Sequence, residues 1–308
     1  MNNWVKKAFH TPSFIILFCI ASVLILIPVF APILAPNNPV ATDYGSLLQR
    51  GSRQYPLGTD QIGRCILSRL IYGGRTSLLV VFAVIFLSVV LGLGLGILAG
   101  YLGGMADQVI SFLVNIMMSV PATVFVIAYV GMMGSGLLHT VEAMVLTGWC
   151  AYARISRTLV LSIKNNTYID EARLGGAGPL SLLFQYILPN MLPYFVVIIT
   201  QDIGEKLLSL AGLSLLGLAS QPPVPEWGFM LSEGRRYMQT APWMILYPGI
   251  WIVFHVVVFS LLGDCLRDIL QPDVKRKRKK RRKNRNEKES FGRFSGSSNG
   301  SIPAGRLR

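Results

Sequence analysis

The chain has 308 residues, of which 52% are hydrophobic and only 14% are charged, and its mean hydropathy is +0.51. Soluble domains carry about 25% charged residues, so this composition excludes an ordinary soluble protein and indicates a membrane protein. The formal net charge of +14 belongs to one end: residues 275–308 hold 14 Lys and Arg against two Glu, whereas the rest holds 15 basic against 13 acidic residues.

Apolar runs near the length of about 20 residues that crosses a bilayer predict six membrane spans. They lie at about 13–35, 77–101, 109–133, 137–152, 192–218 and 243–262. The third contains Pro121, and the fourth is the shortest and contains Glu142. The predicted fold class is therefore all-α, a polytopic membrane protein with an N-terminal segment 1–12, a six-span domain 13–273 and a basic, disordered tail 274–308.

Three glycines repeat every four residues in the second span, at Gly92, Gly96 and Gly100. This spacing removes side chains from one face of a helix, so that another helix can approach its backbone closely. The neighbouring helix can belong to a second subunit or to this same chain, and the sequence leaves both interpretations open.

A polar segment broken by glycines, 166–189, separates the fourth span from the fifth. Thr167 and Asp170 have the spacing of a capping box, which predicts the start of a short helix with acidic residues in its first turn. Gly175 and Gly176 should end that helix, because glycine tolerates the positive φ of a helix C-terminus.

A second short helix is expected to begin at Pro179, since proline suits the first helical turn, and to stop at Pro189. Its apolar residues would then form one stripe, made of Leu180, Leu183, Phe184 and Ile187. Two short helices with an apolar stripe outside the bilayer predict a surface that docks on another protein.

Three ionisable residues interrupt the fifth span at Asp202, Glu205 and Lys206. Their spacing puts them on one helix face, where Asp202 can pair with Lys206. A charge in the bilayer costs about 2.5–3.5 kcal/mol or more, so such residues face a cavity or a partner. Asp202 and Glu205 therefore either line a translocation path or belong to a charge-neutral group at a helix interface.

The positive-inside rule gives the orientation. Six spans put both termini on one side of the membrane, and the basic tail places that side in the cytoplasm, together with the 166–189 segment. Five arginines between the first two spans oppose this assignment, but the tail is much denser in charge. Because the tail directly follows a span, its run KRKRKKRRK favours anionic membrane lipid as a partner over nucleic acid.

The chain contains no G-x-x-x-x-G-K-[ST], G-x-S-x-G or HExxH motif and no Cys/His cluster. We therefore expect no catalytic residues, no cofactor and no metal site. If the protein uses ATP, another subunit must hydrolyse it.

Three blocks of sequence resemble the permease subunit of a bacterial ATP-binding-cassette (ABC) importer, in the branch for dipeptides, oligopeptides and nickel. They are PLGTDQIGRCILSRLIYGGRTSL at 56–78, LAGLSLLGLASQPPVPEWGFML at 210–231 and LLGDCLRDILQP at 261–272. The first block has Cys65 where Asp is common. The resemblance covers residues 10–273 and leaves out the basic tail.

The 166–189 segment resembles the EAA loop of the same family, which has Glu-Ala-Ala, then a glycine, then Leu-Pro. When Gly176 is aligned on the glycine, Asp170, Glu171 and Ala172 take the place of Glu-Ala-Ala. The resemblance implies a coupling helix that docks on an ATPase. The residues that would carry this contact are Asp170, Glu171, Ala172, Gly176, Leu183, Leu188 and Pro189.

The resemblance also implies the type I ABC importer permease fold, in the bacterial inner membrane. Such a subunit works with a second homologous permease, two cytoplasmic ATPases and an extracellular or periplasmic binding protein. TGWCAYARISRTLVLSI at 147–163 and the QDIGEKLL run at 201–208 look most like nickel-type members. Peptide permeases share much of this pattern, so nickel, also as a chelate, is only slightly favoured over peptides.

Two interpretations from other classes remain. A proton-coupled carrier or channel could use Asp202, Glu205 and Glu142 as a relay, although nothing in the sequence suggests inverted repeats and the 166–189 segment would have no role. A purely structural membrane scaffold is the other alternative.

Overall fold

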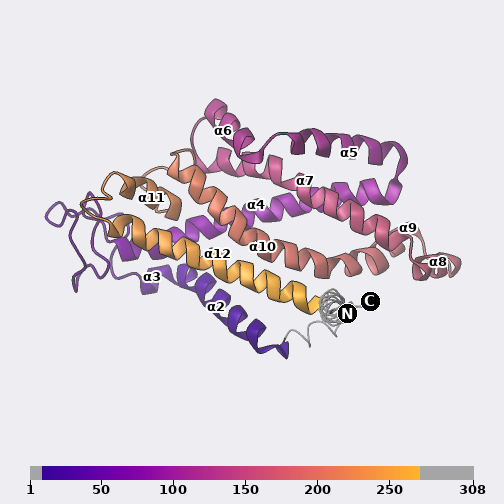
Figure 1. Ribbon diagram of the computed structural model, residues 1–308, viewed down its shortest axis with the longest axis horizontal. Helices are drawn as coiled ribbons and strands as arrows, with labels where there is room; N and C mark the ends of the chain where they lie inside the picture. The colour runs from indigo at the N-terminus through magenta and orange to yellow at the C-terminus, as the bar shows by residue number, and fades with distance from the viewer. Residues whose placement is uncertain (1–8, 271–308) are drawn as a thin grey trace, which may run out of the picture.

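The computed structural model describes residues 9–270, so the predictions for residues 1–8 and for the basic tail from 271 onward lie outside the described residues. Within this range the chain is helical (Figure 1). The elements are α2 (Pro12–Val29), α3 (Ala31–Leu34), α4 (Ile66–Leu102), α5 (Gly104–Ser119), α6 (Ala122–Met133), α7 (Leu137–Lys164), α8 (Thr167–Leu174), α9 (Pro179–Ser181), the π-helix η1 (Leu182–Ile187), α10 (Leu188–Leu215), α11 (Trp227–Arg235) and α12 (Trp243–Leu270).

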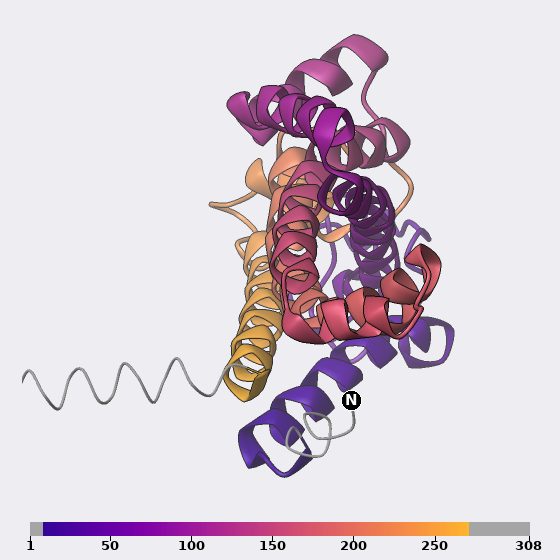
Figure 2. The same cartoon turned by 90° about the vertical axis from the view of Figure 1, so that its right-hand side faces the viewer.

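The long helices α4, α7, α10 and α12 run along the longest axis of the molecule (Figure 1). The short helix α8 lies at one end, and α11 lies at the other end with the segment that joins α3 to α4. Viewed from the α8 end, the 166–189 segment crosses the end of the bundle, and α2 and α5 lie on opposite sides of it (Figure 2). We refer to these as the α8 end and the α11 end.

Four stretches of helix in the described part of the chain are long and apolar enough to cross a membrane, at 12–29, 66–102, 179–215 and 243–270. The bent pair α5 and α6 would add a fifth span. α7 has 28 residues and a length of about 42 Å, which also suffices to cross a bilayer, but it carries Glu142 and Arg154. The all-α membrane fold is confirmed, and the sixth span stays a prediction.

The third expected span is not one continuous helix. α5 and α6 meet at an angle of 84°, so the segment predicted to span the membrane at 109–133 is broken in two, and a crossing by the bent pair stays a prediction. Pro121 explains the break, because proline removes a helical N–H and pushes the residue before it out of the helical conformation. Val120 is accordingly extended, with φ −95° and ψ 129°.

The glycine stripe of the second span packs against α7 of the same chain. A Cβ built on Gly92 would lie 2.5 Å from the carbonyl oxygen of Trp149, and one on Gly100 would lie 2.9 Å from Cβ of Val160. Neither distance is possible for real atoms, so glycine is what allows α4 and α7 to approach so closely. This settles the open question about these glycines in favour of internal packing.

Four charged side chains join the start of α4 and the segment before it to α11 at the α11 end. Arg64 and Arg69 each contact both Asp60 and Glu233, and the Nη2 atoms of the two arginines lie 2.6 Å from the Glu233 oxygens. All four side chains are 12% exposed or less. Two positive and two negative charges leave this cluster neutral, which is the condition for burying ions without a large loss of stability.

Trp227, the first residue of α11, is completely buried against α4. Its indole Nε1 donates to the carbonyl of Leu70 at 2.7 Å, and Gly73 lies against its ring. The preceding Glu226 caps α11 by accepting from the backbone N–H groups of Gly228 and Phe229. The 56–78 block therefore serves to hold α11 and the α11 end together.

Candidate functional site

The 166–189 segment begins with α8, whose start differs from the prediction. Asn166 is the N-cap and Thr167 is already helical, and no side chain caps this terminus. The prediction of a capping box formed by Thr167 and Asp170 is therefore wrong. Asp170 instead pairs with Arg173 at 3.4 Å, and because both side chains are well exposed this contact adds little stability.

The end of α8 follows the prediction. Gly176 has φ +86°, its N–H donates to the carbonyl of Arg173, and the N–H of Ala177 donates to the carbonyl of Ala172, both at 3.0 Å. These two hydrogen bonds define a Schellman motif, which reverses the chain direction after a helix. A Cβ on Gly176 would meet no atom within 4 Å, so glycine is needed here for its backbone angle alone.

The second short helix begins at Pro179 as predicted, but Pro189 does not stop it. The chain continues from α9 through η1 into α10, which runs to Leu215. A proline lacks the N–H that an α-helix needs in its interior, and the wider π-helical turns of η1 come directly before Pro189. Pro189 thus stands in the first turn of α10, where proline is tolerated.

The expected apolar stripe is divided between two faces. Ile187 is fully buried and packs in one cluster with Ile169, whereas Leu180 is 71% and Phe184 is 60% exposed. The wider turn of η1 accounts for this difference, because residues spaced for an α-helix no longer share a face there. Leu174 is 90% exposed as well, so the 166–189 segment has three strongly exposed apolar side chains, Leu174, Leu180 and Phe184, which we call the exposed apolar patch.

The residues predicted for ATPase coupling lie in the same segment as this patch. Asp170, Glu171 and Gly176 are exposed, and the remaining four, Ala172, Leu183, Leu188 and Pro189, are half-buried. The segment therefore has one face anchored in the bundle and one face open, with acidic and apolar side chains on the open face.

The charged face of the fifth span is arranged differently from the prediction. Asp202 accepts a hydrogen bond of 2.5 Å from the hydroxyl of Tyr152 in α7, and Lys206 pairs with Glu205 at 3.5 Å, so the predicted pair of Asp202 with Lys206 is wrong. The Glu205 side chain is 69% exposed. Nothing in the sequence around Tyr152 indicates this role, because a contact between residues 50 positions apart leaves no local pattern.

Comparison with known proteins identifies relatives along most of the chain. It is 38% identical over 258 residues to the di/tripeptide transport system permease protein DppC of Pseudomonas aeruginosa, covering 82% of this chain and 85% of the relative. It is 39% identical to the dipeptide permease DppC of Haemophilus influenzae, covering 82% and 88%, and 43% identical to the glutathione permease GsiD of Salmonella typhimurium, covering 82% and 84%.

Among solved structures, the fold is similar to a chain of the MetNI methionine ABC transporter in an inward-facing crystal form. The TM-score is 0.53 at 20% identity, over 65% of this chain and 95% of that one. Residues 92–276 match the family described as the binding-protein-dependent transport system inner membrane component. Together these matches mean that the chain belongs to that family, as a non-catalytic permease subunit of an ABC importer of the dipeptide and oligopeptide branch, embedded in the inner membrane.

Proposed function

We propose that this subunit forms, with a second permease of the same family, the membrane path for di- or tripeptides. The names of the relatives carry this proposal, because proteins 38–43% identical over most of the chain transport dipeptides, tripeptides or glutathione. These names support the peptide alternative over nickel, which the sequence patterns alone had slightly favoured.

The 166–189 segment is the proposed contact with the ATPase. Support comes from its exposed patch, since apolar side chains grouped beside acidic ones fit a protein partner better than water. The helical structure also suggests a mechanism. The backbone is helical without interruption from Pro179 to Leu215, through α9, η1 and α10. A push on the patch would therefore tilt α10 as a rigid body. The patch then lies in the cytoplasm, as do both chain termini.

Glu205 is the proposed path residue of the fifth span. Lys206 lies 3.5 Å from Glu205, but the Glu205 side chain remains 69% exposed. A carboxylate that faced lipid there would cost about 2.5–3.5 kcal/mol, a cost that a water-filled path or a partner subunit would avoid. A peptide carries a positively charged terminal amine, which a carboxylate can attract. Asp202 is half-buried and accepts a hydrogen bond from Tyr152 in α7, so it is better assigned to packing.

Uptake measurements test the substrate. Cells that express this chain with the other subunits of its own transport system should accumulate radiolabelled dialanine, and deletion of this chain should abolish the uptake. The same cells should show no dependence of ⁶³Ni uptake on this chain. Nickel uptake without dialanine uptake would overturn the peptide assignment, and dialanine uptake without the ATPases would indicate a carrier.

Co-purification tests the docking patch. We expect Leu180→Glu to lose the ATPase subunits during purification, because a charge replaces the apolar contact. Leu138→Glu is the matched control, since Leu138 is 68% exposed in the first turn of α7, away from the patch. Retention of the ATPases by Leu180→Glu, at the level of the control, would show that the patch does not form the contact.

A further inference from the structure

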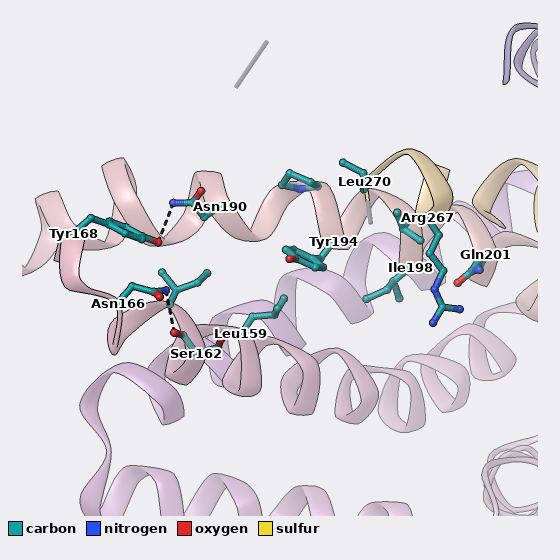
Figure 3. Close-up of a pocket in the computed structure, with 13 residues that line it drawn as sticks. Leu159, Ser162, Asn166, Tyr168, Asn190, Tyr194, Ile198, Gln201, Arg267 and Leu270 are labelled. Carbon is teal, nitrogen blue, oxygen red and sulfur yellow. Dashed lines mark hydrogen bonds between the residues drawn. The ribbon is translucent and has the colours of Figure 1, made fainter. Parts of the chain in front are cut away.

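A cavity of about 690 Å³ opens between α7, α10 and α12, beside α8, and has no role in the function proposed so far. Figure 3 shows that its side chains come from the last turns of α7 and α12, from the start of α8 and from the first half of α10. These helix ends belong to the α8 end of the bundle. In the proposed orientation the cavity lies in the cytoplasmic half of the membrane.

The lining combines an apolar wall with polar groups and a single charge. Leu159, Val197 and Ile198 belong to the wall, and Tyr194 and Gln201 contribute polar atoms. Of the 13 residues that line the cavity, Arg267 is the only charged one and none is acidic. A cavity with one cation, several hydrogen-bond donors and no carboxylate suits an anion.

Arg267 is available for such a ligand. Its side chain extends from α12 into the space between α10 and α7 (Figure 3), and within the described range 9–270 it forms no ion pair. The carboxylate of Asp264, one turn earlier in α12, is bonded instead by Gln201 Nε2 at 2.9 Å. An arginine at a helix end that faces a cavity without a counter-ion is a candidate anion site.

The kind of anion follows from the surroundings. A peptide would bring a positive amine as well as a carboxylate, and the lining offers no carboxylate to receive that amine. An acidic phospholipid instead combines one anionic headgroup with apolar chains, which matches one cation beside an apolar wall. Tyr168 and Tyr194 also face the cavity, and tyrosine is enriched at the level of lipid headgroups.

We propose that this cavity binds an anionic phospholipid from the cytoplasmic leaflet, with its phosphate on Arg267 and an acyl chain along Val197 and Ile198. Basic cavities between spans on the cytoplasmic side bind such headgroups in other membrane proteins. The sequence after α12 adds a second attraction, since the 14 basic residues of 275–308 begin five positions after Leu270 and concentrate anionic lipid nearby.

Lipid retention by the complete importer tests this site. The complex, purified with its partner subunits, is incorporated into nanodiscs of phosphatidylcholine and phosphatidylglycerol in a four-to-one mixture, extracted in mild detergent, and analysed by native mass spectrometry. Arg267→Gln should retain about fivefold less phosphatidylglycerol, the factor expected for about 1 kcal/mol per basic residue. Arg267→Lys should retain more than Arg267→Gln.

Two further variants separate the cavity from general charge effects. Ile198→Trp should fill the apolar wall and reduce retention without changing any charge, provided that the complex assembles normally. Arg276→Gln removes one of the 14 tail charges outside the cavity and should reduce retention clearly less than Arg267→Gln does, and equal losses in the two variants would overturn the cavity site. The proposal is overturned if Arg267→Gln retains phosphatidylglycerol normally, or if inorganic phosphate or dialanine alone displaces the lipid.

Cross-linking from position 198 to the second permease would also overturn it, because the cavity would then be a subunit interface. Dialanine uptake is measured in parallel in every variant. A loss of lipid retention with normal uptake would support the lipid site without bearing on the substrate, so failure of this proposal and failure of the peptide assignment are distinguishable.

Discussion

Gly176 ends α8 through its backbone angle alone. Valine at φ +86° is strained by about 1–2 kcal/mol, so Gly176→Val should disrupt the Schellman motif and displace the exposed apolar patch. We expect uptake and transport-coupled ATPase activity to fall while the amount of protein in the membrane stays unchanged. Both are measured in reconstituted vesicles and by immunoblot.

Gly178 provides the matched control for this prediction. It lies two residues further along, has φ −72°, and a Cβ there would meet no atom within 4 Å. Gly178→Val should therefore retain most of the activity. Equal losses in the two variants would mean that the positive φ of Gly176 is not what the segment requires.

Asp202 and Glu205 are one helical turn apart, but we assign them different roles, and one substitution tests each role. Tyr152→Phe removes the hydroxyl that donates to Asp202, which should lower the stability of the protein by about 1–3 kcal/mol because a half-buried carboxylate loses its partner. Glu205→Gln removes the partner of Lys206, but because the Glu205 side chain is 69% exposed it should lower stability less than Tyr152→Phe does, and it should reduce peptide uptake. Thermal unfolding in detergent and uptake at matched membrane abundance separate the two effects. Normal peptide uptake by Glu205→Gln would show that Glu205 does not line the path.

At the scale of whole elements, two prolines show what the sequence could and could not predict. Both Pro121 and Pro189 follow an apolar run, and the local rule is the same for both. The chain bends by 84° at Pro121, whereas at Pro189 the helix continues because η1 widens before it. Gly176 and Pro179 were predictable because they act on their own backbone. The π-helical turn and the contact of Tyr152 with Asp202 depend on packing between distant segments.

The close packing of α4 on α7 gives a prediction at the same scale. Gly96→Leu should destabilise the protein by about 1–3 kcal/mol or more, because the side chain would collide with the backbone of α7 near Ala153. Gly94→Leu is the control, since Gly94 lies in the same helix and faces open space. Thermal unfolding of the purified chain should show a large loss only for Gly96→Leu, and similar melting of the two variants would contradict the packing.

At the scale of the whole molecule, the two ends differ in construction. The α11 end is held by the buried cluster of two arginines and two carboxylates, whereas the α8 end exposes an apolar patch on a segment whose other face packs in the bundle. In the proposed function a push by the ATPase on the patch tilts α10, which connects the two ends. A rigid α11 end would give α10 a fixed point about which to tilt.

Glu233→Gln tests this division of the molecule. The substitution leaves Arg64 and Arg69 with Asp60 alone, and an uncompensated buried charge costs about 3–5 kcal/mol. We expect faster proteolysis of the segment between α3 and α4, and a lower unfolding temperature, while binding of the ATPases through the patch persists. Glu171→Gln, which removes an exposed carboxylate at the α8 end, should leave proteolysis at the α11 end unchanged. If Glu233→Gln released the ATPases as readily as Leu180→Glu, the two ends would be mechanically inseparable, and α10 could not act as a lever about a fixed α11 end.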